Sequence, residues 1–213
     1  MWKDVFSEFR PGLTSSEDDI ARAEAALGFP LPSSYKAFAR ECGAGRIGGQ
    51  VRIATPVPVE AADFVTRAHL TAHAVAAAID GLNADPLARD EPHRFTIEGD
   101  ADAALMERAC FFGQTEAGAF LFWDVVSGTE ALSGEVAAGS SLESAATGGT
   151  EYEVWVLGAD LENIHYGGAD LLAFVTGLQG REIPHILGEG ASPLPATFEG
   201  DDAASLAALA GTA

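Results

Sequence analysis

Apolar residues recur at helical spacing near the start of the chain. Over residues 17–27 they lie on one face of a helix, between Ser16 and Gly28, and Asp19 stands three positions after Ser16. A small polar residue followed three positions later by an acidic one is typical of a capping box, and glycine commonly ends a helix. The pattern therefore predicts a helix over residues 17–27. A second apolar stripe predicts another helix over residues 33–42.

The middle of the chain changes to short apolar and alternating stretches, which favour strands. We predict strands over residues 46–55, 94–98, 109–113, 119–126, 152–157 and 163–166, and further helices over 60–82 and 169–178. Helices come first, strands cluster in the middle and a helix closes the pattern. This order predicts an α+β fold with a central, mainly antiparallel sheet, flanked by the N-terminal helices and a late C-terminal helix.

The length of 213 residues suits one domain with appendages. We predict a single domain over residues 1–187, with an inserted helical segment near 60–92 and a loop over 128–150. Residues 188–213 are acidic and rich in Gly, Pro and Ala, so we predict a tail with at most a short helix over 202–210. The expected core contains Leu27, Leu31, Tyr35, Phe38, Phe112, Phe120, Phe122, Val154 and Phe174.

Charge narrows the choice of partners. The formal net charge is −20, from 32 acidic and 12 basic residues, and only Arg181 is basic after Arg108. Phosphates would be repelled, so nucleic acid and anionic membranes are disfavoured as partners. The balance fits a basic protein partner. No apolar run is long enough for a signal peptide or a membrane span, so we expect a cytoplasmic protein.

Candidate catalytic and metal-binding patterns are weak. The stretch Gly43–Gly48 matches G-x-G-x-x-G, but it follows a predicted helix and opens a strand, the reverse of a dinucleotide site. His69 and His73 share a helix face, yet no third metal ligand is suggested. Asp100 and Asp102 begin like a calcium loop that does not continue. We therefore expect no catalytic residue, metal or cofactor, and interpret Cys42 and Cys110 as reduced core residues.

Three groups of motifs occur in a recognisable order. They are Ile20-x-x-Ala23-Glu24-x-x-Leu27-Gly28-x-x-Leu31-Pro32-x-x-Tyr35-Lys36-x-Phe38 followed by Gly43-x-Gly45, then Phe111-Phe112-Gly113 with Gly118-x-Phe120-Leu121-Phe122-Trp123-Asp124, and finally Tyr152-x-Val154-Trp155 with Asp170-Leu171-Leu172-x-Phe174-Val175. Together they resemble the SMI1/KNR4 family (SUKH superfamily) over residues 15–178. The resemblance implies an α+β binding module without catalytic residues, and many bacterial members look like immunity proteins that neutralise toxins.

Three functions remain open from the sequence. The resemblance and the charge favour an immunity-type protein that neutralises a basic toxin, for which nucleases are one source. A regulatory or scaffold protein with several cytosolic partners is the alternative, and an unrecognised hydrolase or ligand-binding enzyme is the third. For the first, we predict that one acidic rim of the sheet contacts the partner, formed by Asp124, Glu130, Glu151, Glu153, Asp160 and Glu162. A solvated acidic surface that only aids solubility is an equally simple reading of these residues.

Overall fold

The structure is a computed structural model that describes residues 2–84, 93–99, 103–125 and 149–210. Its elements are, in chain order, η1 (Trp2–Asp4), β1 (Glu8–Arg10), α1 (Glu17–Leu27), α2 (Ser33–Glu41), β2 (Gly45–Ile47), β3 (Val51–Ile53), α3 (Phe64–Ala84), β4 (Thr96–Ile97), η2 (Ala103–Arg108), β5 (Ala109–Thr115), β6 (Phe120–Asp124), β7 (Val154–Leu157), β8 (Asn163–Gly168), α4 (Leu171–Gln179), α5 (Ile183–Leu187), β9 (Thr197–Gly200) and α6 (Ala203–Ala210).

The strands of the described residues form one sheet in the order β1-β9-β2-β3-β5-β6-β7-β8-β4. Only the two outermost pairs, β1 with β9 and β4 with β8, are parallel. All the pairs between them are antiparallel. The predicted α+β fold with a mainly antiparallel sheet is therefore confirmed.

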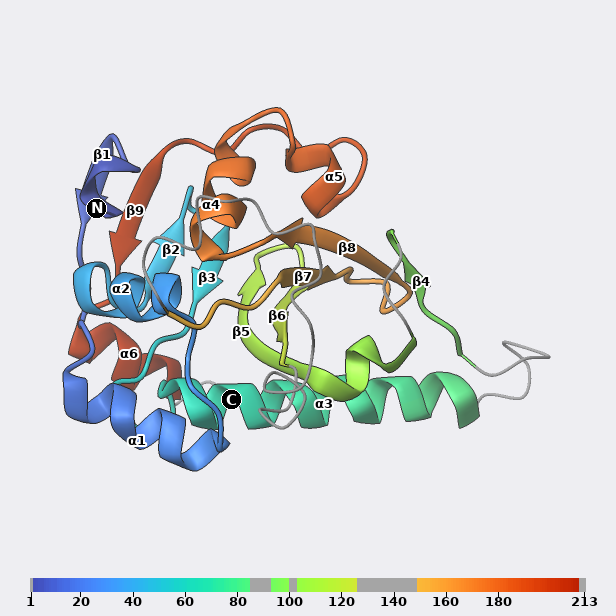
Figure 1. Cartoon of the computed structure of the whole chain (residues 1–213), viewed down its shortest axis with the longest axis horizontal. Helices are drawn as coiled ribbons and strands as arrows, with labels where there is room; N and C mark the ends of the chain where they lie inside the picture. Colours follow the sequence, from blue (N-terminus) through green and yellow to red (C-terminus); the bar gives the residue numbers. More distant parts are fainter. Residues whose placement is uncertain (1, 85–92, 100–102, 126–148, 211–213) are drawn as a thin grey trace.

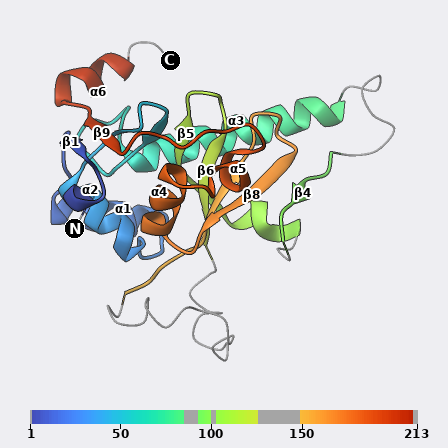
Figure 2. The ribbon, with the colours of Figure 1, turned by 90° about the horizontal axis from the view of Figure 1, so that it is seen from above.

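Helices lie on both sides of this sheet (Figure 1). Figure 2 shows α3 running along the strands; it contacts β5 and also α1, while α4 contacts α2 and β8. The two largest of three apolar clusters involve these elements. The larger contains Tyr35, Phe112, Trp123 and Phe174, and the smaller contains Phe122 with Trp155.

The first helix forms as its sequence predicts. The Ser16 hydroxyl accepts a hydrogen bond from the Asp19 backbone N–H at 3.1 Å, and the Asp19 carboxylate accepts one from the Ser16 N–H at 3.0 Å. Gly28 ends the helix in the left-handed region, with φ of 80°. Both ends of α1 are thus closed by local chemistry, which explains why the sequence alone locates it.

The predicted strand over residues 46–55 is wrong as a single strand. The structure has a hairpin instead, in which β2 and β3 pair Gly45 with Ile53 and Ile47 with Val51. Gly48 and Gly49 make the turn with φ of 56° and 70°. Glycine adopts this left-handed conformation without steric cost, so two adjacent glycines allow the chain to reverse there.

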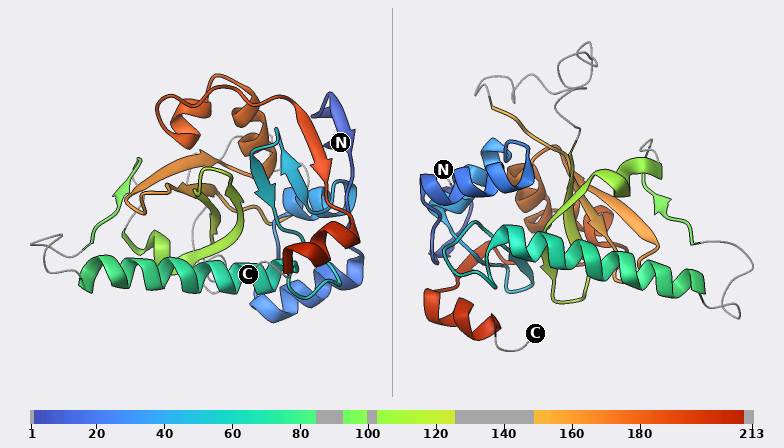
Figure 3. Two further views of the ribbon diagram at one scale, coloured as in Figure 1. Left: turned by 180° about the vertical axis from the view of Figure 1, so that it is seen from behind. Right: turned by 90° about the horizontal axis from the view of Figure 1, so that it is seen from below.

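The expectation of at most a short helix after residue 188 is also wrong. The short helix exists as α6, but Thr197–Gly200 forms β9, which inserts between β1 and β2. Phe198 of β9 is buried and packs against Phe6, Phe9 and Phe38. Figure 3 shows β1 and β9 side by side at one end of the molecule. An aromatic side chain therefore anchors this segment in the core.

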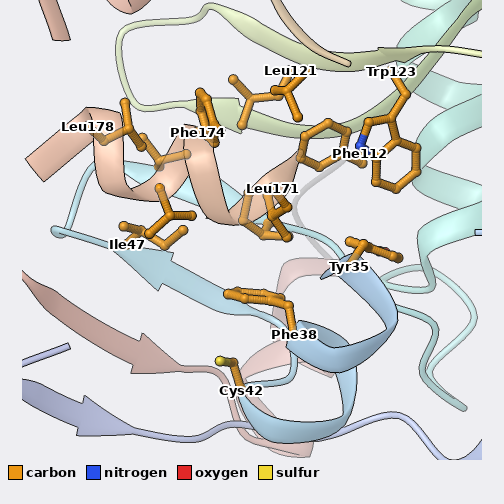
Figure 4. Close-up of a cluster of buried hydrophobic side chains, with 14 of the residues drawn as sticks. Tyr35, Phe38, Cys42, Ile47, Phe112, Leu121, Trp123, Leu171, Phe174 and Leu178 are labelled. Atoms are coloured by element: carbon orange, nitrogen blue, oxygen red, sulfur yellow. The ribbon is translucent and has the colours of Figure 1, made fainter. Parts of the chain in front are cut away.

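Most of the predicted core is confirmed. Seven of the nine residues are buried, and Figure 4 shows Tyr35, Phe38, Phe112 and Phe174 among the side chains that fill the larger cluster. Leu27 and Phe120 are only partly buried, because each stands at the end of its element. The predicted insert corresponds to α3 over residues 64–84, with residues 85–92 outside the described part, and most of the predicted 128–150 loop also lies outside it.

Candidate partner-binding surface

An exposed tyrosine stands out on β8. Tyr166 is 38% exposed, and among the described residues only Leu70 is another large hydrophobic side chain with such exposure. The register pairs Tyr166 with Trp155 of β7, and their rings meet edge to face with centroids 5.2 Å apart. Trp155 is buried, and its contact restricts the motion of the Tyr166 ring. A rigid, partly exposed aromatic ring of this kind is a typical anchor of a protein interface.

Two carboxylates lie beside this ring. Glu153 is exposed and immediately precedes β7, and its carbonyl accepts the Asp124 N–H of β6. Asp170 caps α4 through a 2.7 Å bond from the Ala173 N–H. Burial, followed by the charges of Glu153 and Asp170, raises the pKa of the Tyr166 hydroxyl. We call Glu153, Trp155, Tyr166 and Asp170 the Tyr166 surface; it presents two negative charges around a neutral phenol.

A groove adjoins the Tyr166 surface at the β4–β8 edge of the sheet. It has a volume of about 320 Å³ and lies between these strands and α5, with Glu98, His165, His185 and Glu189 in its lining. The Glu98 carboxylate accepts a 3.3 Å hydrogen bond from the Tyr166 backbone N–H, beyond the point where β4 ends. It also lies 3.5 Å from the His165 ring. Glu98 therefore extends the acidic character of the Tyr166 surface to the sheet edge.

The predicted acidic rim is only partly assembled. Pairing of β6 with β7 brings Asp124 next to Glu153, and the Asp124 N–H donates to the Glu153 carbonyl at 3.3 Å. Asp160 and Glu162 instead lie in the turn between β7 and β8, at the opposite end of β7. The six residues thus do not form one rim, because Asp124 and Glu153 lie at the start of β7, whereas Asp160 and Glu162 lie beyond its other end. Glu130 lies outside the described residues.

Two of the predicted carboxylates are held by partners within the chain. The Arg108 guanidinium binds Asp124 with both ends, Nε to Oδ1 at 2.5 Å and Nη2 to Oδ2 at 2.9 Å. The Asp160 carboxylate accepts bonds from the backbone N–H groups of Glu162 and Asn163 and from the Asn163 amide. Asp124 is therefore neutralised and Asp160 shapes a turn. The Glu153 side chain has no hydrogen-bond or ion-pair partner among the described residues, and it is exposed close to Tyr166.

Glu151 has a structural task that its sequence position conceals. Its carboxylate accepts bonds from the Ser34 N–H at 2.8 Å and the Ser34 hydroxyl at 2.7 Å, at the first turn of α2. The N-cap residue of α2 is Pro32, which makes no side-chain cap bond. Glu151 thus supplies, from 117 residues away, the acceptor that the helix start lacks.

Substitution of Glu151 should affect stability in a way that depends on pH. Glu151→Ala should lower the free energy of unfolding by about 1–2 kcal/mol, because a helix cap is lost. Burial raises the pKa of the Glu151 carboxyl above 4.5, so the folded state keeps its proton longer than the unfolded state does. As pH rises from 4.5 through the pKa of Glu151 in the folded state, ionisation of Glu151 therefore lowers the free energy of unfolding.

Denaturant unfolding at several pH values measures this effect. Glu151→Gln keeps an acceptor oxygen and cannot ionise, so it serves as the matched variant. The stability of the unsubstituted protein relative to Glu151→Gln should fall between pH 4 and pH 7. A difference that stays constant over this range would contradict the argument.

The surplus of negative charge has a structural basis. At least seven of the twelve lysines and arginines already form ion pairs with carboxylates of the chain. All seven precede residue 109, and only one base follows. The carboxylates that flank β7 and β8, which include Glu153 and Asp170, therefore have few cations nearby in the sequence, and their field reaches solvent.

The patterns that suggested other chemistry have structural explanations. Gly43 and Gly48 have positive φ, and a Cβ at Gly45 would meet the backbone of β9, so the three glycines of G-x-G-x-x-G serve chain packing. His69 and His73 are exposed on α3. No group of three or more His, Cys, Asp or Glu in the described ranges is arranged to hold a metal ion. Cys42 and Cys110 are buried free thiols, and burial raises the pKa of Cys110 to about 12.

Comparison with known families decides the relationship. The sequence pattern of the SMI1 / KNR4 family (SUKH-1) matches residues 14–137, more than half of the chain. The chain belongs to the SMI1/KNR4 family. This match contains α1 to β6 and ends before β7, so the family likeness of residues 152–175 stays a prediction. Neither the curated proteins nor the solved structures that were searched contain a match.

The helices were also compared with the length and hydrophobicity of a membrane span. Within residues 2–84, 93–99, 103–125 and 149–210, no helix is both long and apolar enough to traverse a bilayer.

The sequence analysis did not identify Tyr166 and Asp170 as candidate site residues. Asp170 entered the sequence analysis only as the first residue of a family motif and Tyr166 belonged to no motif, and the pairing of β7 with β8 is what brings Tyr166 to Trp155.

Proposed function

We propose that this SMI1/KNR4 protein is a non-catalytic binding module of the immunity type, which neutralises a toxin by direct contact in the cytoplasm. The partner domain is basic, and nucleases are one class of toxin with such a surface. The observation that carries the proposal is the Tyr166 surface, where an anchored aromatic ring stands among unneutralised carboxylates. Membership of the family supports the binding role.

The Tyr166 surface has the composition of a small interface. An aromatic side chain with little conformational freedom can fill a pocket of the partner, while charged groups at the rim guide its approach. The acidic surplus of the whole chain acts in the same direction, because it accelerates encounters with a basic molecule. Neither contribution needs a reacting group, a metal or a cofactor.

A co-expression assay tests this function. A candidate toxin domain, sought among the neighbouring genes, is produced in cells together with the unsubstituted protein, with Tyr166→Ala plus Glu153→Lys, or with Glu8→Lys. Glu8 is exposed on β1, at the opposite edge of the sheet, and its substitution changes the net charge as much as Glu153→Lys does. Survival should be restored by the unsubstituted protein and by Glu8→Lys, and should fall at least tenfold with the double variant. Absence of protection by the unsubstituted protein would contradict the proposal.

Binding kinetics with the purified toxin domain separate the electrostatic contribution of Glu153 from the packing contribution of Tyr166. Glu153→Lys should slow association at low salt, and the difference from Glu8→Lys should shrink as salt rises, because exposed charges are screened within about 10 Å at 0.1 M. Tyr166→Ala should instead speed dissociation at every salt concentration. Equal association of the two lysine variants across the salt series would remove Glu153 from the interface.

The regulatory or scaffold alternative has lost one of its two reasons. It rested on a long loop and on an acidic tail that would fold upon binding. The tail segment contains β9, which already belongs to the sheet. A pull-down that recovers several unrelated cytosolic proteins and no toxin would favour this alternative.

A further inference from the structure

We propose that the Tyr166 surface binds an arginine side chain of the partner, with the guanidinium stacked on the Tyr166 ring between Glu153 and Asp170. This inference rests on the proposed function only in that the partner is a basic protein. It identifies the chemical group that the surface recognises, and it can be tested without a toxin.

The ring is suited to a flat cation. Tyr166 contacts Trp155 edge to face, at 74° between ring planes, and 38% of the tyrosine remains exposed to solvent. Trp155 keeps the tyrosine ring fixed, so a cation that stacks on the ring does not have to immobilise it first. A guanidinium is planar and weakly hydrated, and it stacks on aromatic rings more readily than the compact, strongly hydrated ammonium of lysine.

The carboxylates beside the ring have free accepting capacity. Asp170 Oδ1 is occupied by the cap bond to Ala173, while its second oxygen has no partner among the described residues. The Glu153 side chain likewise has none in that part of the chain. A guanidinium has five N–H donors in a rigid plane, so one group can stack on the ring and donate to carboxylates on two sides.

Nearby charges favour a cation and exclude an anion. Glu153 precedes β7, Asp170 follows β8, and Glu98 holds the Tyr166 backbone at the sheet edge. Asp124, which follows Trp123 on β6 and donates its N–H to the Glu153 carbonyl, is bound at both carboxylate oxygens by Arg108. The Trp155 indole N–H, buried beneath the surface, has no hydrogen-bond partner in the described residues. The surface thus combines two carboxylates with an aromatic face, the composition that recognises an organic cation, and Glu98 lies next to it at the sheet edge.

Titration with small probes, followed by the backbone amide resonances in NMR, tests this proposal. The probes are the blocked tripeptides acetyl-Gly-Arg-Gly-amide, the same peptide with lysine, and the same peptide with neutral citrulline, each added up to about 20 mM at low salt. The arginine peptide should shift the resonances of Glu153, Tyr166 and Asp170 and the Trp155 indole signal. The lysine peptide should bind at least threefold more weakly, and citrulline should leave these signals unmoved.

Three substitutions locate the binding energy. Tyr166→Phe should keep binding of the arginine peptide within about twofold, whereas Tyr166→Ala should weaken it at least fivefold. Glu153→Gln should weaken it at least threefold, and the matched control Glu8→Gln should leave it unchanged. Equal binding of arginine and citrulline peptides, equal effects of the two glutamine variants, or no shift at 20 mM would overturn the proposal. If the toxin is neutralised but no arginine preference is found, this inference fails and the proposed function stands.

Discussion

Replacement of Trp123 by alanine should lower the free energy of unfolding by about 3–5 kcal/mol, the cost of emptying a large buried site. Trp123 is fully buried on β6, near the middle of the sheet. Its ring stacks on Phe112 at 4.3 Å and meets Tyr35 edge to face at 4.7 Å (Figure 4). It also meets Phe64 edge to face at 5.8 Å. Removal of the indole leaves three aromatic neighbours from three elements without their common contact.

Denaturant unfolding measures the loss, and Trp123→Phe provides its control. The Trp123 indole N–H has no hydrogen-bond partner in the part of the chain that the structure describes. Phenylalanine therefore removes some apolar contact but no hydrogen bond, and should cost clearly less than alanine. Equal losses for the two variants would show that the site does not depend on aromatic packing.

Replacement of Gly200 by alanine should cost about 3 kcal/mol or more, because the new methyl group meets backbone and not a movable side chain. A Cβ at Gly200 would fall against the backbone N and Cα of Gly12. Gly45 lies opposite Gly200 in the β2–β9 pair, and a Cβ there would meet the Glu199 carbonyl. Three chain segments thus approach each other closely through glycines, and any side chain would separate them.

Gly81→Ala is the matched control for Gly200→Ala. A Cβ at Gly81 meets nothing within 4 Å, and the residue lies inside helix α3. Alanine should stabilise the protein there by about 0.5–1 kcal/mol, since glycine is a poor helix former. Opposite signs for the two substitutions, measured by denaturant unfolding, would confirm that close backbone approach and not glycine content limits the β9 region. A neutral Gly200→Ala would contradict this argument.

Local signals explain what the sequence could predict. Helix α1 has a capping box and a terminal glycine, and the strands β5 to β7 have apolar runs of ordinary length, so each carries its own evidence. Strands β1 and β9 have only three and four residues. Their stability comes from each other and from Phe198, which packs against aromatic residues far away in the sequence. The spacing of apolar and polar residues along the chain does not indicate such pairing.

The candidate site shows the same division. Charge counting indicated that carboxylates near β7 lack cations; Asp124 has one in Arg108, whereas Glu153 is exposed without a cation partner among the described residues. It could not reveal that Arg108 binds Asp124, that Glu151 caps α2 or that Asp160 supports a turn. Each of these contacts joins a carboxylate to a group set by tertiary structure or turn geometry. The sequence did not indicate Tyr166 for the same reason, because the ring that it contacts, Trp155, lies on the paired strand β7.

The position of β9 has a consequence for the order in which the protein folds. Among the described residues, strand β1 pairs with β9 alone, and the two are 189 residues apart in sequence. During synthesis the hairpin of β5 and β6 needs only neighbouring residues, whereas β1 must wait until residue 200 has been made. Until then Phe6 and Phe9 lack the ring of Phe198 that covers them in the folded state. Phe6 and Phe9 therefore gain this contact only after β9 has been synthesised, and the pairing of β1 with β9 completes the packing around these two rings.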